Sequence, residues 1–297
     1  MLVAAHQIER LLAPLQPGGA LQIDEIKQHN HVYRVVAGGD VLFLKVYTKD
    51  WYGGDIAATA GCVQHERAAW AMLAAHGMST PAVLVSEANC DNPLGRPVLV
   101  TRGLAGQALG TTDPDVTLAQ LPAVGDYLRR MHAIAFDRAG YLMPGGPEDF
   151  ASATDWRHPL WMFEVWKQQA LRNLEHERAV LPPALYGRVR ATLEQSESIL
   201  APAYELPRYT HGDCWPHQFF VAERPERVEE GGWAVTGVLD MEVASAGDAE
   251  ADFVHFLLEL AACLPATSCW WEGLFGGYGA EPDFERFRVR LLATTEA

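Results

Sequence analysis

Two short segments in the last third of the chain constrain its fold most strongly. The first reads HGDCWPHQ at 211–218 and runs into the apolar residues 219–221, and the second reads GVLDME at 237–242 and ends the apolar run 233–239. The residues between these runs are charged and include Gly and Pro, which indicates a solvated turn. If the two runs pair antiparallel, Gln218 lies beside Asp240. The pattern therefore predicts a hairpin, with Asp213 just upstream as a base beside a hydrated magnesium ion.

These segments resemble those of the aminoglycoside phosphotransferase and choline kinase superfamily, whose members are related to protein kinases. The usual form is H-G-D-x-x-x-x-N, a hydrophobic strand, and then D-x-E or D-x-D. The resemblance implies that Asp213 is the catalytic residue that orients the attacking hydroxyl and accepts its proton, and that Asp240 binds the metal. The chain departs from the pattern at Gln218, which replaces the usual Asn but still offers a carbonyl oxygen as a metal ligand. His211 is expected to hold the loop through hydrogen bonds.

Simpler interpretations exist for single residues of this pattern. A lone H-G-D is a common turn, and Asp240 could cap the end of a strand. Asp248 could be the N-cap of a helix over 249–262. The combination of both motifs with the apolar strands, in this order, favours the kinase-like interpretation.

An independent signal lies in the N-terminal third. Residues 41–47 form an apolar strand interrupted only by Lys45, and 61–76 read as a helix ended by Gly77. Glu66 shares the apolar face of that helix with Trp70 and Leu73, at spacings of four and seven residues. A buried lysine and a carboxylate on an apolar face are natural partners, although a snorkelling lysine and a solvated glutamate are the simpler alternative. In kinases, such a lysine holds the phosphates of the nucleotide and the glutamate holds the lysine.

A glycine-rich phosphate loop is absent from the sequence. Its place is taken by KQHNHVYRV at 27–35, in which VYRV resembles the strand that follows the polar turn in many small-molecule kinases. Backbone N–H groups of such a turn can face phosphates. The sequence leaves the form of this cradle open.

The predicted fold is α+β with two lobes, as in protein kinases. Residues 1–100 are expected to form a nucleotide-binding lobe with a small antiparallel sheet and one helix, and 107–297 a mainly helical lobe that carries the catalytic loop and the acceptor site. Helices are expected over 116–136, 159–180, 183–200, 248–262 and 284–293. The segment 101–106 is expected to be the hinge, where the resemblance implies that adenine meets the backbone near Thr101 and Gly103.

Charge and composition narrow the partners. Residues 1–102 contain 8 basic and 9 acidic side chains, whereas the remainder contains 15 and 29. An acidic chain is a poor binder of nucleic acid, and no segment reaches membrane-spanning length. The beginning of the sequence does not resemble a signal peptide, and five cysteines without a framework spacing indicate free thiols, so we expect a cytoplasmic protein.

The sequence thus predicts a magnesium-dependent kinase that transfers phosphate from ATP or GTP to a hydroxyl of a small molecule. The acidic helical lobe favours a cationic, aminoglycoside-like acceptor and a role in antibiotic resistance. The alternatives are a metabolic kinase for a sugar or amino alcohol, and a kinase-like nucleotide-binding module without activity. Five tryptophans in the helical lobe are candidates for an acceptor pocket, but scattered core packing is the simpler interpretation: Trp156, Trp161, Trp166, Trp270 and Trp271.

Overall fold

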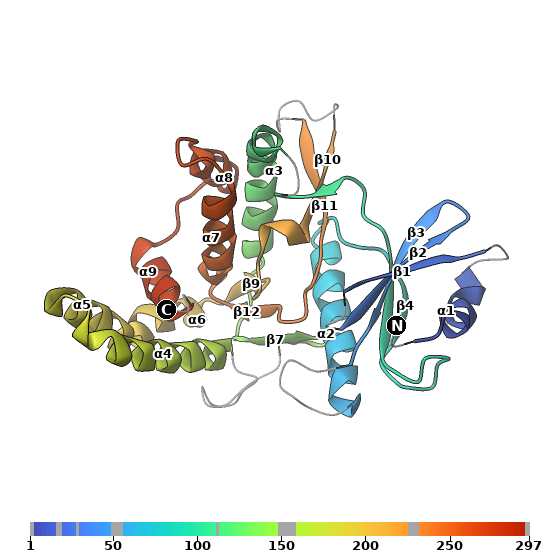
Figure 1. Cartoon of the computed structure of the whole chain (residues 1–297), viewed down its shortest axis with the longest axis horizontal. Coiled ribbons are helices and arrows are strands. Elements are labelled where there is room, and N and C mark those ends of the chain that lie inside the picture. Colours follow the sequence, from blue (N-terminus) through green and yellow to red (C-terminus); the bar gives the residue numbers. More distant parts are fainter. Residues whose placement is uncertain are drawn as a thin grey trace. The chain divides into compact units, whose positions relative to one another are not determined.

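The computed structural model describes residues 3–15, 20–27, 30–48, 56–110, 113–147, 159–224 and 232–294. The chain forms two compact units (Figure 1). Unit 1 contains Met1–Gly106 and Thr236–Glu242, and unit 2 contains Gln107–Val235 and Val243–Ala297. A short segment late in the sequence therefore returns to the N-terminal unit. Trp156 and part of the predicted phosphate cradle, residues 28–29, lie outside the described residues.

Unit 1 is built on a five-stranded sheet in the order β1-β2-β3-β5-β4, with every neighbouring pair antiparallel. The strands are β1 (Gln22–Lys27), β2 (His31–Ala37), β3 (Asp40–Val46), β4 (Val83–Glu87) and β5 (Val98–Arg102). The turn between β2 and β3 consists of Gly38 and Gly39, both at positive φ. Two such residues fit the tight turn that matches the twist of a β-hairpin.

The two faces of this sheet are covered by different helices. Successive side chains of a strand point to opposite faces, so Leu44 and Val46 of β3 lie on one face and Lys45 on the other. The face with Leu44 packs against Ile8 of α1 (Ala5–Leu12) in one apolar core. Lys45 instead meets Glu66 of α2 (Ile56–Ala75), and Figure 1 shows α1 and α2 on opposite sides of the sheet. The helix α1 was not predicted from the sequence.

Unit 2 is mainly helical. It contains α3 (Pro114–His132), α4 (Pro159–His176), α5 (Pro183–Glu194), α6 (Ser196–Glu205), α7 (Phe253–Cys263), α8 (Trp270–Tyr278) and α9 (Phe284–Thr294). The short 3-10 helices are η2 (Glu177–Ala179), η3 (Pro216–Gln218) and η5 (Ala249–Asp252). No helix in the described part of the chain has the length and apolar character to cross a bilayer.

Two small sheets complete the fold. One has the order β11-β10-β6, from β6 (Gln107–Ala108), β10 (Phe219–Glu223) and β11 (Trp233–Val238). The other has the order β8-β7-β12-β9, from β7 (Gly140–Met143), β8 (Gly146–Pro147), β9 (Arg208–Thr210) and β12 (Ser245–Gly247). The predicted runs 219–221 and 233–239 are therefore neighbouring strands, as expected, and most of the turn between them lies outside the described residues.

The predicted α+β class is confirmed, with an antiparallel sheet in unit 1 and a mainly helical unit 2. Several boundaries differ from the sequence prediction. The helix expected over 183–200 is divided at Gln195 into α5 and α6, and the helix expected over 248–262 begins as the 3-10 segment η5. The helix α8 was missed, because its sequence WWEGLFGGY contains three glycines, which are poor helix formers.

The glycines of α8 have a packing reason. A Cβ added to Gly277 would lie 2.0 Å from the carbonyl oxygen of Pro122 in α3, and one added to Gly125 of α3 would lie 2.1 Å from that of Leu274. The two helix backbones therefore approach more closely than any side chain allows. Gly276, the neighbour of Gly277 in α8, has nothing within 4 Å of the same added atom.

We predict opposite effects of alanine at these two neighbouring positions. Gly277→Ala should lower the free energy of unfolding by about 1–3 kcal/mol, because the added methyl group pushes α3 and α8 apart. Gly276→Ala should raise it by up to about 1 kcal/mol, because alanine is the better helix former. Urea titrations of the two variants measure both effects. Equal stability of the two would contradict the close approach of the helices.

Candidate active site

A buried lysine surrounded by carboxylates forms the first group of candidate residues, within unit 1. Lys45 Nζ lies 2.9 Å from Glu66 Oε2 and 2.8 Å from Asp240 Oδ1, and it also pairs with Glu242 Oε1. We call these four residues the Lys45 cluster. The predicted Lys45–Glu66 pair is therefore present, and the snorkelling alternative is wrong. Trp70, one helical turn after Glu66, donates its indole N–H to Val238 O at 2.9 Å, which ties α2 to the segment that leads into Asp240.

The Lys45 cluster carries more negative than positive charge. Burial opposes the ammonium form, but Asp240 and Glu66 outweigh it and hold the pKa of Lys45 well above its ordinary value. Burial raises the pKa of Glu66 to about 7; Lys45 opposes this shift, while Glu242 and Asp240 add to it. Three carboxylates thus share one ammonium group in the Lys45 cluster.

In the Lys45 cluster, Asp240 has an unusual backbone conformation and Glu242 is held by side-chain hydrogen bonds. Asp240 adopts a left-handed conformation, with φ of 62°, which is strained for a residue other than glycine. Glu242 accepts hydrogen bonds from Asn30 Nδ2 at 3.1 and 3.2 Å, and Asn30 Oδ1 accepts one from Thr48 N at 3.2 Å. Asn30, in the segment 27–35 that was predicted to cradle the phosphates, is therefore hydrogen-bonded to Glu242 of the Lys45 cluster. Sequence reasoning did not single out Asn30.

The two residues predicted near the adenine lie at the end of β5. Thr101 belongs to the strand, which continues to Arg102, and it pairs with Phe43 of β3. Gly103 follows the strand and donates its N–H to Val41 O at 2.7 Å. A Cβ on Gly103 would lie 3.1 Å from the same oxygen, so glycine suits this position. Their roles in nucleotide binding stay predictions.

The Asp213 loop, residues 211–218, contains the second group of candidate residues, within unit 2. It follows β9 and turns at Gly212, where φ is 85° and an added Cβ would lie 2.3 Å from Val243 O. Asp252 of η5 accepts hydrogen bonds from the backbone N–H groups of His211 at 2.7 Å and Gly212 at 2.9 Å. Each oxygen of Asp252 accepts one of these bonds. This buried carboxylate therefore satisfies both donors and fixes the turn that presents Asp213.

Asp252 is itself held by His132 of α3, whose Nε2 lies 3.1 Å away. The sequence analysis did not identify Asp252 or His132 as part of the site. The available signal was a carboxylate directly before the apolar residues that begin α7. His211, which was expected to support the loop, is fully buried, and its Nδ1 accepts the N–H of Asp213 at 3.4 Å.

Asp213 presents a carboxylate that is kept ionised. Its Oδ1 accepts the indole N–H of Trp215 at 2.8 Å, and His255 Nδ1 lies 3.7 Å from the same oxygen. Burial alone would raise the pKa of Asp213, but the contacts to His255 and Trp215 lower it below its ordinary value. The side chain is 30% exposed. A charged, accessible carboxylate of this kind can accept a hydrogen bond from a hydroxyl group.

Gln218 lies at the end of η3 and is largely buried. Its Oε1 accepts the backbone N–H of Trp215 at 2.9 Å, so the amide closes the Asp213 loop. A carbonyl oxygen has a second lone pair, and the role of Gln218 as a metal ligand stays a prediction. Within the described ranges, no group of three His, Cys, Asp or Glu side chains is arranged to hold a metal ion. Magnesium usually uses one or two protein carboxylates and completes its shell with water and phosphate.

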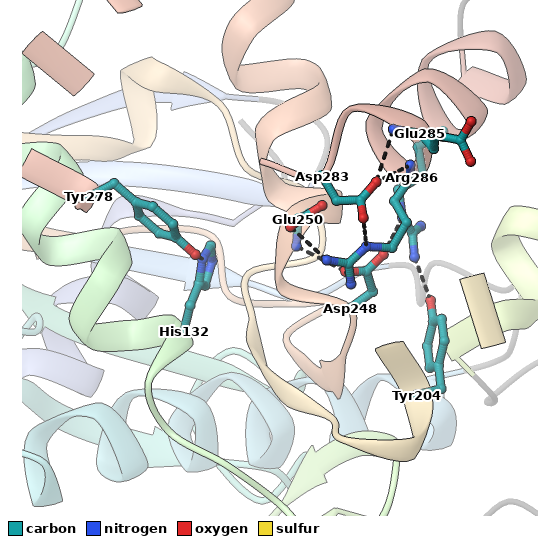
Figure 2. Close-up of polar contacts among 9 residues, drawn as sticks. His132, Tyr204, Asp248, Glu250, Tyr278, Asp283, Glu285 and Arg286 are labelled. Carbon is teal, nitrogen blue, oxygen red and sulfur yellow. Dashed lines mark hydrogen bonds and ion pairs between the residues drawn. The ribbon is translucent and has the colours of Figure 1, made fainter. Parts of the chain in front are cut away.

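A network of ion pairs lies near η5 (Figure 2). Arg286 of α9 pairs with Glu250 at 2.7 Å and lies 3.7 Å from Asp248, which also binds Arg290 at 2.9 Å. Asp248 accepts the N–H of Glu250 at 3.1 Å as the N-cap of η5, so its interpretation as a helix cap is confirmed. The network joins α9 to the segment that carries Asp252. It borders a groove of about 1060 Å³ that also includes His132.

Two of the five tryptophans considered for an acceptor pocket can be placed. Trp270 and Trp271 lie in α8 with their rings in an edge-to-face arrangement, 5.8 Å apart, and Trp271 is exposed. Trp161 and Trp166 belong to α4. A role of any of these residues in acceptor binding stays a prediction.

Comparison with known proteins agrees with this geometry. The sequence profile of a family described as "Phosphotransferase enzyme family" matches residues 21–292. No curated protein sequence gives a significant match.

Several solved structures share the fold. An aminoglycoside-3'-phosphotransferase of type VIII is 22% identical, with 98% of each chain covered and a TM-score of 0.56. The aminoglycoside phosphotransferase APH(3'')-Id from Streptomyces rimosus, solved with ADP and streptomycin, is 18% identical over 96% of this chain and 95% of its own, with a TM-score of 0.61. The predicted two-lobed, protein-kinase-like fold is therefore confirmed.

The anchor of the Asp213 loop generates a prediction. Asp252→Asn should lower the free energy of unfolding by about 1–3 kcal/mol, because its NH2 group replaces one of the two carboxylate oxygens that accept the backbone N–H groups and leaves that donor unsatisfied. Thermal denaturation and amide hydrogen exchange at Gly212 measure the effect. Asp126→Asn is the matched control, since Asp126 forms only an exposed pair with Arg129, which is worth about 0–1 kcal/mol. Equal losses in the two variants would contradict the anchoring role.

Proposed function

Because this chain belongs to the phosphotransferase enzyme family, we propose that it transfers the terminal phosphate of ATP or GTP to a hydroxyl of a cationic small molecule. The phosphotransferase activity follows from the family. The assignment of residues rests on Asp213, whose ionised and accessible carboxylate lies on a loop fixed by Asp252. The donor, the metal and the acceptor are argued separately below.

The nucleotide is assigned to unit 1. Lys45 is the phosphate-binding cation and Glu66 keeps it in place, as in the kinase pattern. Thr101 and Gly103 lie where the adenine is expected to meet the backbone. Magnesium fits the excess negative charge of the Lys45 cluster, with Asp240 as its carboxylate ligand and Gln218 as the proposed carbonyl ligand. When bound, it would neutralise charge on the phosphates.

Asp213 is assigned to the acceptor. The acceptor oxygen forms a bond to the γ-phosphorus, the bond from this phosphorus to the bridging oxygen of the nucleotide breaks, and the hydroxyl proton passes to Asp213. Positioning of the hydroxyl contributes more than proton abstraction, because the transition state of phosphoryl transfer is loose and involves little early removal of the proton.

The charge distribution supports a cationic acceptor. Residues 103–297 carry an excess of 14 acidic side chains, whereas residues 1–102 are nearly neutral, and a field of this sign attracts cations. Structures with the same fold have been solved with streptomycin, hygromycin B and kanamycin. We therefore propose an aminoglycoside-like acceptor and a role in antibiotic resistance. The nucleotide donor supports a place in the cytoplasm.

Two other functions compete with this proposal. A metabolic kinase would use the same residues on a sugar or an amino alcohol. A nucleotide-binding module without activity would be expected to lose at least one essential contact. The retained pairs of Lys45 with Glu66 and Asp240 favour an enzyme.

The first test measures nucleotide consumption with magnesium against panels of aminoglycosides, sugars and amino alcohols. Asp213→Ala should lower kcat for the best acceptor by about 10²–10⁴-fold, the usual contribution of a positioned general base. Its affinity for nucleotide should remain near that of the wild type, because Asp213 serves the acceptor. Asp115→Asn, an exposed change at the start of α3, is the control. Wild-type turnover by Asp213→Ala would refute the assignment.

The second test addresses the charge of the acceptor. If ammonium groups pair with carboxylates of unit 2, the KM of the acceptor should rise several-fold as salt increases from about 0.05 to 0.5 M, because partly exposed charge pairs are screened over about 10 Å or less. The KM of a neutral sugar should stay nearly constant in the same series. A flat profile for the best acceptor would favour the metabolic kinase.

A further inference from the structure

Two aromatic side chains surround the carboxylate of Asp213. Trp215 donates its indole N–H to Asp213 Oδ1 at 2.8 Å. The ring of His255 stacks on the indole with centroids 4.5 Å apart and planes within 11°, and its Nδ1 lies 3.7 Å from the same oxygen. Both contacts fall on Oδ1, and the described part of the chain offers no hydrogen bond to Oδ2. One carboxylate oxygen is thus held while the other remains available to a substrate.

The support comes from α7, outside the motif. His255 lies in α7, and Glu259, one helical turn later, lies 3.3 Å from His217 Nδ1 of the Asp213 loop. The ring of His217 also faces the indole of Trp215, but less closely, with centroids 6.3 Å apart. The helix α7 begins directly after Asp252, which fixes the start of the same loop. One helix and its N-terminal segment therefore hold the loop at both ends.

The chemistry of tryptophan suits this arrangement. An indole N–H can only donate a hydrogen bond, so it always favours the ionised form of Asp213 and cannot compete for the proton of the acceptor. The flat ring has few rotamers, and stacking on His255 restricts it further. A carboxylate that is free to rotate does not hold its oxygens in one position. An error of about 1 Å in the position of a reacting group can lower the rate about 100-fold.

We propose that Trp215 is a positioning residue that fixes the carboxylate of Asp213 with Oδ2 toward the acceptor hydroxyl, and that His255 supports it by stacking. This proposal rests on the proposed function, in which the carboxylate of Asp213 orients the acceptor hydroxyl. Trp215 acts through Asp213 and does not touch the reacting atoms. Its loss should therefore lower kcat and leave the KM for nucleotide and the stability of the fold nearly unchanged.

The decisive variant removes the N–H and little else. Site-specific incorporation of 3-benzothienylalanine at position 215 replaces the indole nitrogen by sulfur and retains the size and stacking of the ring. We expect kcat for the acceptor to fall about 10–100-fold, with the KM for ATP and the melting temperature within error of the wild type. Wild-type turnover by this variant would contradict the proposal even if Asp213→Ala is inactive. Inactivity of the wild type with every acceptor would instead contradict the proposed function.

The role of His255 is tested by two substitutions. His255→Leu removes the stacked ring and should lower kcat about 10-fold, and His255→Phe should recover part of the loss because it restores the stack. His176→Leu is the matched control, since His176 is an exposed histidine at the end of α4, outside the Asp213 loop and α7. Equal losses in the Leu and Phe variants would refute support by stacking.

A spectroscopic measurement tests the contact without any acceptor. The indole N–H resonance of Trp215, assigned by its absence in Trp215→Phe, should shift and exchange faster with solvent in Asp213→Asn. The corresponding resonances of Trp270 and Trp271 serve as internal controls. A resonance of Trp215 that does not respond to Asp213→Asn would overturn the proposal, whatever the activity of the enzyme.

Discussion

The buried ammonium group of Lys45 is the interaction on which unit 1 depends. A charge in the interior is tolerated only when it is paired, and here the partners come from α2 and from the segment 236–242. Removal of Lys45 would leave its carboxylates without a counter-charge, and an uncompensated buried charge typically costs about 3–5 kcal/mol. The pairing therefore explains why a short piece of chain, remote in sequence, is part of the N-terminal unit. It also leaves an excess of negative charge in the Lys45 cluster, which supports the proposed magnesium site.

The same constraint operates in unit 2 with backbone groups in place of a charge. The turn at Gly212 directs two N–H groups inward, and unsatisfied buried donors cost about 1–3 kcal/mol each. Asp252 accepts both, and His132 holds Asp252 in turn. In each unit, a residue of the active-site motif supplies one partner and a residue more than twenty positions away supplies the other. Satisfying these buried groups and positioning the functional side chains are thus achieved by the same contacts.

The difference between motif residues and their partners remote in sequence explains how much of the candidate site could be predicted from the sequence. Lys45 and Glu66 were found because a charged residue on an apolar strand or helix face requires a partner, and this requirement can be read from periodicity. Asp213 and Asp240 were singled out by motif spacing, and their catalytic and metal-binding roles stay predictions. Asn30, Asp252 and His255 were missed because each lies in an ordinary local context. Their importance comes from tertiary contacts, which one sequence does not reveal.

The fold shows the same limit. Strands such as β3 and β5, and the long helices α2 and α3, follow from their apolar patterns. The helix α8 was missed because Gly277 is unfavourable for a helix in isolation and becomes necessary only where the backbone meets Pro122 of α3. The strands β9 and β12 are three residues each, too short for an alternating pattern to be recognised. Local propensity thus fails where packing between elements decides the structure.

Trp215 connects Asp213, which matches the family motif, with Gln218, which departs from it. Its indole N–H binds Asp213, and its backbone N–H binds Gln218. The extra methylene of glutamine gives the amide a longer reach than asparagine, and here the carbonyl oxygen closes the loop onto the residue that holds Asp213. A substitution that shortens or removes this amide therefore acts on the orientation of Asp213 as well as on any metal. Gln218 therefore belongs to the same support as Trp215 and His255, and ligation of magnesium through its second lone pair stays a prediction.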